Sequence, residues 1–334
     1  AKEFYSNTFP SLNSKEYYTV YPPIAQALFT IGAYIAGSDL QIFSIVLKLF
    51  FVAFELGSIY FLIKLLAHFK INKAHVLIYA LNPLIVIEFC GNLHFESAMI
   101  FFFIAAIYFL ISNKLLFSSL LFACSIASKL LTLIFLIFLI RRLGWKKAIQ
   151  YFILVGLFTA LLFLPIVASF GIENFAKSLN LYFQKFEFNA SIYYIARQIG
   201  YWKKGFNLIA VIGPALGIVS LISILLIFFF EKAKDFQSYF QICLFAICIY
   251  LLFTTTVHPW YLGLAILCSV FSKYKFVLLW SFLICLTYIN YSFPEYHEVL
   301  WIVALEYILV IGFFLYELNI NIAFQAKFEK DVRR

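Results

Sequence analysis

The chain has 334 residues, of which 64% are apolar, 21% aromatic and 12% charged, and its mean hydropathy is +0.96. Water-soluble domains carry about 25% charged residues, so this chain has about half the charge that a water-soluble surface needs. The net charge of +9 is divided among short basic clusters between apolar runs, unlike the continuous basic patch that binds nucleic acid. The composition excludes cytosolic, disordered, disulfide-rich and nucleic-acid-binding proteins and predicts a multi-pass membrane protein.

Apolar runs follow one another along most of the chain. A membrane-spanning helix needs about 20 mostly apolar residues, and several of these runs are shorter. We therefore expect an all-α fold, a polytopic transmembrane helical bundle with about 11 membrane segments plus interfacial helices. The expected segments are 41–67, 75–90, 97–112, 115–128, 130–140, 150–169, 206–230, 236–256, 260–272, 276–291 and 299–318.

The basic residues predict the orientation of the bundle. If residues 1–40 lie outside and the chain then alternates, most Lys and Arg residues fall on the inner side. The short outer loops at 91–96, 257–259 and 294–298 contain neither Lys nor Arg. This distribution satisfies the positive-inside rule and predicts an integral membrane protein whose residues 1–40 face outside.

The runs 115–128 and 130–140 could form one continuous helix or a short hairpin. One continuous helix would invert every later loop and break the positive-inside rule repeatedly. The distribution of charge therefore predicts a hairpin, with Lys129 at its tip.

Two segments are not expected to span the membrane. Residues 22–37 begin with Pro-Pro, which suits the first turn of a helix, and spanning would break the alternation, so we place them on the outer interface. Residues 171–204 form a long, aromatic-rich outer loop typical of amphipathic helices at headgroup level. The expected organisation is an outer loop with an interfacial helix over 1–40, a bundle over 41–318 and a basic cytoplasmic tail over 319–334.

The six cysteines lie inside or beside apolar runs and none has C-x-x-C spacing, which predicts small buried apolar side chains without a redox or metal role. They are Cys90, Cys124, Cys243, Cys248, Cys268 and Cys285. Asn189-Ala-Ser191 matches a glycosylation acceptor, a three-residue pattern that also arises by chance.

Some charged residues fall within apolar runs, where each costs about 2.5–3.5 kcal/mol on insertion scales. Lys48 and Glu55 are seven residues apart and share one helical face, and we expect them, with Glu88, in a polar bundle interior. Glu306 lies in the middle of the last run. Ion pairing inside the bundle would explain these residues without a functional role.

The predicted alternation brings several ionisable residues to the outer side. One outer loop contains Asn92, His94 and Glu96, and Lys129 lies at the hairpin tip. His258 lies in a second outer loop, and the turn at 294–298 forms a third. Lys and His could bind a phosphate, and His94 with Glu96 could hold a divalent cation, Mg or Mn. The alternative is that these are only polar residues wetted at the membrane surface.

Four blocks follow one another along the chain, namely Tyr21–Gln26, Asn82–Glu96, Ser128-Lys129 and His258–Tyr261. The strongest of them are the Tyr-Pro-Pro-x-Ala-Gln and Glu-x-x-Gly-Asn-x-His-x-acid blocks. In this order they make the chain resemble the bacterial polytopic GT-C glycosyltransferases. More narrowly, the chain is similar to the polyprenyl-phosphate-mannose-dependent mannosyltransferases over most of its length.

The resemblance implies inverting transfer of a hexose, most simply mannose, from a polyprenyl phosphate to a lipid or glycan acceptor at the outer face. The family's catalytic acid lies in its first outer loop, ahead of the Tyr-Pro-Pro block. Because Ala1 is only about twenty residues ahead of Tyr21, we expect an N-terminally truncated chain without that aspartate. Glu96 stands where the family often has Asp, which loosens the geometry of any metal site.

The site residues follow from the resemblance and the chemistry together, because cationic groups stabilise a leaving phosphate as its charge develops. The expected donor-phosphate or metal contacts are Lys129, His94, Glu96 and Arg197. The expected sugar or acceptor contacts are Tyr21, Asn92, His258, Trp260 and Tyr261. Aromatic faces stack on sugar rings, although the outer-loop aromatics suit membrane anchoring equally well.

Two other functions compete with sugar transfer. A transporter or lipid flippase would use Lys48, Glu55, Glu88 and Glu306 along a translocation path. A membrane scaffold would need no outer cluster and would tolerate its substitution.

Overall fold

A computed structural model describes residues 19–171, 173–174, 186–294 and 297–332 of the chain. The described residues form helices and one isolated β-bridge, and no strand, which confirms the all-α prediction. The α-helices are α2 (Pro23–Ala36), α3 (Leu40–His68), α4 (Leu77–Ala80), α5 (Glu96–Ile111), α6 (Leu115–Ser128), α7 (Leu133–Leu136), α8 (Leu139–Leu143), α9 (Trp145–Phe170), α11 (Ile192–Lys204), α12 (Ile209–Phe230), α13 (Phe236–Phe253), α14 (Gly263–Ser269), α15 (Phe276–Leu283) and α16 (Leu300–Val332). Short 3-10 segments are η2 (Lys73–Val76), η4 (Leu130–Thr132), η5 (Pro259–Leu262) and η6 (Ile284–Ser292), and η3 (Ile85–Gly91) is a π-helix.

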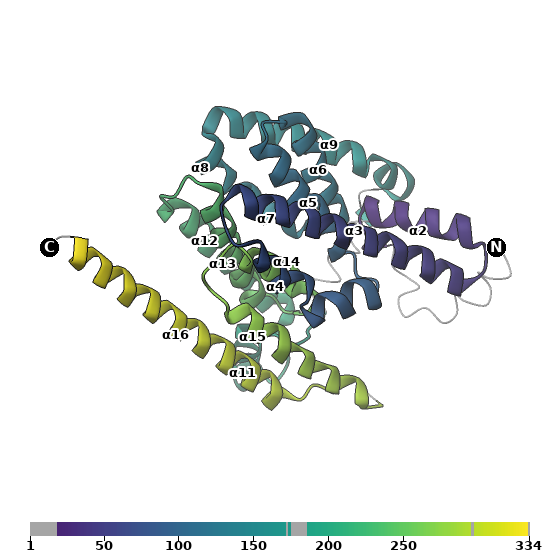
Figure 1. Cartoon of the computed structure of the whole chain (residues 1–334). Coiled ribbons are helices and arrows are strands. Elements are labelled where there is room, and N and C mark those ends of the chain that lie inside the picture. Colours follow the sequence, from purple (N-terminus) through teal and green to yellow (C-terminus); the bar gives the residue numbers. More distant parts are fainter. Residues whose placement is uncertain (1–18, 172, 175–185, 295–296, 333–334) are drawn as a thin grey trace.

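The helices pack in two rows. The first row runs through α3, α5, α6 and α9, and the second through α12, α13, α14, α15 and α16 (Figure 1). Contacts of α14 with α5 and of α7 with α13 join the rows. The last helix, α16, extends along one side of the bundle to the C-terminus (Figure 1).

Five helices among the described residues are long and apolar enough to cross a membrane, namely α3, α9, α12, α13 and α16. The number becomes six if Lys73–Ala80 and Ile85–Gly91 form one span, which is bent by 61°. The other expected segments form shorter apolar helices or helices broken into α and 3-10 pieces. The chain is thus a polytopic helical protein.

The chain reverses direction at Lys129, as predicted. The backbone of Lys129 is extended (φ −163°, ψ 134°), which ends α6. The hydroxyl groups of Ser125 and Thr132 then approach to 3.1 Å, although seven residues in a straight helix would separate them by about 10 Å along its axis. The hairpin interpretation of 115–140 is therefore confirmed.

Loops predicted on the inner side meet at one end of the bundle. Arg142 in α8 pairs with Glu231 at the end of α12, and His75 Nδ1 lies 3.3 Å from the carbonyl oxygen of Val270. At the other end, the rings of His94 and Trp260 stack, and Phe188 bridges to Thr256. The predicted alternation agrees with the structure, while the assignment of the second end to the outside rests on the positive-inside rule.

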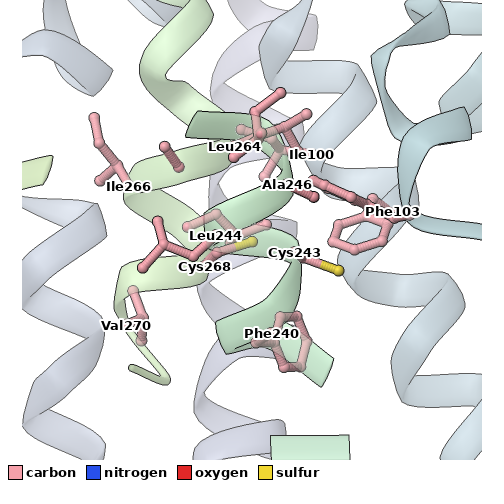
Figure 2. Packing of buried hydrophobic residues seen from close by; sticks show 14 of the residues in the cluster. Ile100, Phe103, Phe240, Cys243, Leu244, Ala246, Leu264, Ile266, Cys268 and Val270 are labelled. Atoms are coloured by element: carbon pink, nitrogen blue, oxygen red, sulfur yellow. The ribbon is translucent and has the colours of Figure 1, made fainter. Parts of the chain in front are cut away.

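The core between the rows lies directly beneath the His94 and Trp260 loops. Side chains of α5, α13 and α14 interdigitate there, and small residues such as Ala246 allow the helices to approach closely (Figure 2). Cys243 and Cys268 are free thiols buried in this cluster (Figure 2). The prediction of buried apolar cysteines holds for these two and for Cys248, whereas Cys285 is exposed.

Gly263 at the start of α14 sets the contact between α14 and η3. A Cβ at this position would overlap the ring of Phe89 and come within 3.2 Å of Ile100. We predict that Gly263→Ala lowers the free energy of unfolding by about 1–3 kcal/mol, because overpacking forces neighbours out of place. Thermal unfolding in detergent measures it, with Gly217→Ala in α12, where a Cβ meets nothing within 4 Å, as the control. Equal melting temperatures of the two variants would contradict the prediction.

The structure corrects the expected polar interior at one position. Lys48 is exposed on α3, whereas Glu55 is buried and accepts a hydrogen bond from the Tyr79 hydroxyl at 3.2 Å. The two residues share a face, but α2 packs beside Leu47 and Phe51 and does not cover Lys48. Shared periodicity therefore does not give the two side chains the same surroundings.

The segment 22–37 forms α2, which packs antiparallel to the first turns of α3. Gly32 lies against Phe43 and Leu47, and Phe29 stacks on Phe43 with centroids 6.4 Å apart. Its placement at the outer interface stays a prediction. Residues 1–18, 172, 175–185 and 295–296, which include parts of the expected outer loops, lie outside the described residues, as do the side chains of 322–334 in the expected tail.

Candidate functional site

A cavity of about 370 Å³ lies at the end of the bundle predicted to face outside. It brings together residues from all four blocks that carry the resemblance. The sequence-predicted residues that line it are Tyr21, His94, Glu96, Lys129, Trp260 and Tyr261. Apolar side chains of the hairpin, Leu130, Leu131 and Ile134, form another part of the wall. The cavity therefore combines a polar, cationic region with an apolar one.

The Tyr-Pro-Pro-x-Ala-Gln block forms the cavity rim because its residues start α2. Pro23 occupies the first turn, and the Gln26 amide turns back to donate to the hydroxyl of Thr19 at 2.7 Å and to the carbonyl of Tyr21 at 3.3 Å. The Tyr21 ring packs edge-on against Phe29 at 5.3 Å. These contacts fix the position of Tyr21 at the entrance.

Lys129 places its charge in the cavity wall. Its ammonium group pairs with the carboxylate of Glu96, whose side chain is 2% exposed, while the Lys129 side chain is 27% exposed. The Lys129 Nζ also lies 4.1 Å from the ring centroid of Tyr261. The partly open ammonium group is thus neutralised on its buried side and remains accessible on the other.

His94 follows a strained turn. The π-helix η3 ends at Gly91, and Leu93 adopts a positive φ of 64°, which is unfavourable for a leucine. The turn brings His94 Nε2 to 3.2 Å from Oε2 of Glu88. The Asn92 amide donates to both oxygens of Glu88, each at 3.2 Å. Asn92 therefore supports Glu88 and is not among the residues that line the cavity.

Trp260 stacks between two imidazoles. Its ring centroid lies 3.7 Å from that of His94 and 4.4 Å from that of His258, with interplanar angles of 15° and 9°. Two rings so close to one indole cannot share a face without overlapping, so they cover opposite faces. Both faces of Trp260 are therefore covered, and an edge of its indole is the part that faces the cavity.

His258 lies behind Trp260 and not in the cavity wall. Its ring is buried and also stacks on Phe188 at 4.7 Å, and its Nδ1 has no hydrogen-bond partner among the described residues. Burial, with the nearby charge of Lys129 second, lowers the pKa of His258 to about 3. His258 therefore supports Trp260 from behind and is not among the residues that line the cavity, and its contact with a sugar or acceptor stays a prediction.

This burial makes stability depend on pH. An unfolded histidine titrates near pH 6.5, so below that pH the unfolded state binds a proton that folded His258 refuses until about pH 3. We predict that this residue alone destabilises the fold by about 2 kcal/mol between pH 6.5 and 5. Melting temperatures at both pH values for the wild type and His258→Phe, which keeps a stacking ring, measure the effect. Parallel pH dependences of the two proteins would contradict it.

Arg197 lies outside the cavity. Its guanidinium pairs with Glu187, and Glu187 also accepts hydrogen bonds from the Tyr193 hydroxyl at 2.5 Å and the Asn207 amide at 3.1 Å. The charge of Arg197 is therefore used to fasten α11 to the segment before it. The structure does not bring Arg197 together with Lys129 in the cavity wall.

Asn189 is a structural residue and not a modification site. It is fully buried, its amide donates to Glu306 at 3.2 Å, and its backbone N–H donates to Glu298 at 2.5 Å. The indole of Trp280 donates to the same Glu306 at 2.7 Å. Glu306 thus joins α15, α16 and the segment after residue 186.

The described residues do not fit a divalent cation at the predicted position. No group of three or more His, Cys, Asp and Glu side chains in the described part of the chain is arranged to hold a metal ion. Glu96 is paired with Lys129, and His94 Nε2 faces Glu88.

Several lining residues were not singled out from the sequence. Thr254, Thr255 and Thr256 line the cavity at the end of α13, and Thr256 donates to the carbonyl of Phe186 at 3.0 Å. Three threonines directly after a long apolar run were a signal for them. Tyr288 does not line the cavity, but its hydroxyl donates to Glu88. No sequence pattern indicated this contact, because only the packing of η6 brings Tyr288 close to Glu88.

Comparison with known proteins gives a family match that includes part of the residues that line this cavity. Residues 15–144 match the family model described as alpha-(1->6)-mannopyranosyltransferase, N-terminal domain. The matched segment contains Tyr21, Glu88, His94, Glu96 and Lys129, whereas Trp260 and Tyr261 lie beyond it. A search of curated proteins gave no match. Over residues 15–144 the resemblance to mannosyltransferases is confirmed, and the match supports mannosyl transfer.

Proposed function

Since residues 15–144 carry the N-terminal-domain pattern of the alpha-(1->6)-mannopyranosyltransferase family, we propose that the chain transfers mannose from a polyprenyl-phosphate donor. The acceptor is a lipid or glycan hydroxyl at the outer face of a bacterial inner membrane, and the transfer inverts the anomeric centre. The observation that supports this most is a cavity that combines Lys129 with an apolar wall.

The donor's chemistry matches the two regions of the cavity. A polyprenyl chain needs apolar surroundings, which Leu130, Leu131 and Ile134 offer, and its phosphate needs a cation, which Lys129 offers. Departure of the sugar leaves a second negative charge on the phosphate. Lys129 stabilises that charge at the moment it develops, which is the most effective use of a fixed cation.

The sugar and the acceptor would meet polar edges. Trp260 presents its indole edge, Tyr21 lies at the rim, and Thr254–Thr256 add hydroxyl and carbonyl groups. We assign Tyr261 to the donor side, because its ring supports Lys129. Arg197 has no part in this assignment.

The test is transfer by the chain in proteoliposomes. A radiolabelled polyprenyl-phosphate mannose is supplied with candidate lipid and glycan acceptors, and the product is analysed for its linkage and anomeric configuration. A mannosylated product of inverted configuration is expected. Substrate flux across the vesicles without sugar transfer would contradict the proposal and favour a transporter or flippase.

A second measurement tests the proposed face. Single cysteines are introduced at exposed positions at each end, Trp202 in α11 and Lys146 in α9, with the native cysteines replaced. An impermeant maleimide applied to intact spheroplasts should label the first position and not the second. The reverse pattern would place the cavity on the cytoplasmic side and refute the outer assignment.

A further inference from the structure

Lys129 and Glu96 form an ion pair in the wall of the cavity. Among the described residues that line this cavity, they are the lysine and the glutamate, and neither an arginine nor an aspartate is present. The Glu96 side chain is 2% exposed and the Lys129 side chain 27% exposed, so the cation is the more accessible member of the pair. The two charges cancel, and a phosphate in the cavity meets a cation that is already neutralised.

Glu96 is held in place by the start of α5. It lies in the first turn of this helix, where the positive end of the helix dipole favours a negative charge. The next residue, Ser97, is fully buried, and its hydroxyl donates to the carbonyl of Phe51 in α3 at 3.1 Å. The backbone that carries the carboxylate is therefore fixed by α5 and α3, independently of Lys129.

The donor and the product of the proposed reaction differ in charge. The phosphate of a polyprenyl-phosphate sugar is a diester with one negative charge. Departure of the sugar leaves a monoester, whose second pKa is about 6, so the product carries two negative charges above that pH. A lysine without a counter-charge would hold this product more strongly than the donor, and the product would then block the cavity.

We propose that Glu96 weakens the hold of Lys129 on a phosphate so that the polyprenyl monophosphate product can leave. This inference rests on the proposed function. A carboxylate and a phosphate repel, so Glu96 acts by its charge and not by contact with the ligand. Because the repulsion grows in proportion to the charge of the ligand, it weakens binding of the product more than binding of the donor.

A merely structural role of Glu96 predicts a different outcome. If the carboxylate only positioned the ammonium group of Lys129, an uncharged residue of the same shape would weaken the binding of every phosphate alike. Charge balance predicts the opposite sign, because Lys129 without its counter-charge attracts phosphates more strongly. It also predicts a larger effect for a ligand with two charges than for a ligand with one.

The test is direct binding of two lipids to the purified chain in nanodiscs at pH 8. One is radiolabelled polyprenyl phosphate with two charges, and the other is its methyl ester with one. Glu96→Gln should lower the Kd of the methyl ester by about three- to tenfold and that of the phosphate by about 10–100-fold, since each charge contributes about equally. Glu96→Asp, which is shorter but keeps the charge, should retain the wild-type ratio of the two Kd values.

Controls separate this role from folding and from the proposed function. Glu55→Gln removes another buried carboxylate, which lies outside the cavity, and should leave both Kd values unchanged. All variants should keep the wild-type melting temperature within a few degrees. In the wild type itself, which needs no substitution, the two Kd values should differ by less than about tenfold, because the pair is neutral.

The outcomes are distinct. Slower turnover of Glu96→Gln in proteoliposomes, with stronger inhibition by added polyprenyl phosphate, would support the inference. Equal changes in the two Kd values, weaker binding of both lipids, a larger wild-type preference for the phosphate, or a Glu96→Asp variant that behaves like Glu96→Gln would overturn it. A wild type that transfers no sugar would overturn the proposed function itself, whatever the two Kd values are.

Discussion

Replacing Lys129 by methionine is expected to lower kcat/KM for the polyprenyl-phosphate donor by about 10³. Methionine keeps the length of the side chain and removes the charge that would stabilise the leaving phosphate. Loss of one preorganised electrostatic contact typically lowers the rate by about 10²–10³. The variant would also lose the attraction between the ammonium group and the phosphate of the bound donor. Transfer assays with the labelled donor over a range of concentrations measure both contributions.

The Lys129 variant needs a partner substitution, because it leaves the nearly buried carboxylate of Glu96 without its cation. Breaking such a pair from one side is destabilising by about 3–5 kcal/mol. The double variant Lys129→Met/Glu96→Gln should recover stability but not transfer. Lys48→Met removes an exposed lysine from α3 and should change neither. A double variant with wild-type turnover would eliminate Lys129 as the donor contact.

The sequence predicted the end of the bundle at which the cavity lies. Basic clusters fixed the side of each loop, and the alternation then required Lys129 and His94 to lie at the same end. The structure brings both to one cavity. Their common side could be predicted because the positive-inside rule depends only on the composition and order of the loops. Sidedness is a property of the whole chain that needs no knowledge of packing.

The fine positions of the side chains could not be predicted in the same way. Arg197 was expected to bind a phosphate, but Glu187, ten residues earlier, reaches it once α11 folds. Trp260 was expected to contact a sugar or acceptor, and nothing in its local sequence indicated that His94 and His258 cover both faces of its indole. Both outcomes depend on how the chain folds, the first on the position of α11 relative to the segment before it and the second on packing between loops that are distant in the chain.

The burial of residues at different heights along one helix could not be predicted from the sequence either. Lys48 and Glu55 occupy one face of α3, and periodicity alone gives them equal burial. The surroundings change over the two turns between them, since Tyr79 reaches Glu55 while nothing in the described part of the chain covers Lys48. A seven-residue spacing predicts direction around a helix axis and not what lies at each height.

Replacing Arg142 alone by methionine is expected to lower the free energy of unfolding by about 3–5 kcal/mol. The side chains of Arg142 and Glu231 are 0% and 2% exposed, and the guanidinium binds both oxygens of the carboxylate, with Nη1 2.7 Å from Oε2. The single substitution leaves the buried carboxylate of Glu231 without a partner, and a buried unpaired charge costs more than the ion pair contributed.

The double variant Arg142→Met/Glu231→Leu removes both charges and should recover most of this loss, because apolar side chains of similar size replace a buried ion pair at little cost. Thermal unfolding of the wild type, both single variants and the double variant in one detergent gives the coupling energy. Since the pair lies at the opposite end from Lys129, the double variant should also retain mannose transfer. If the double variant were as unstable as Arg142→Met, the pair would be needed for its charges themselves, and the basic inner loops would hold the helices together as well as orient them.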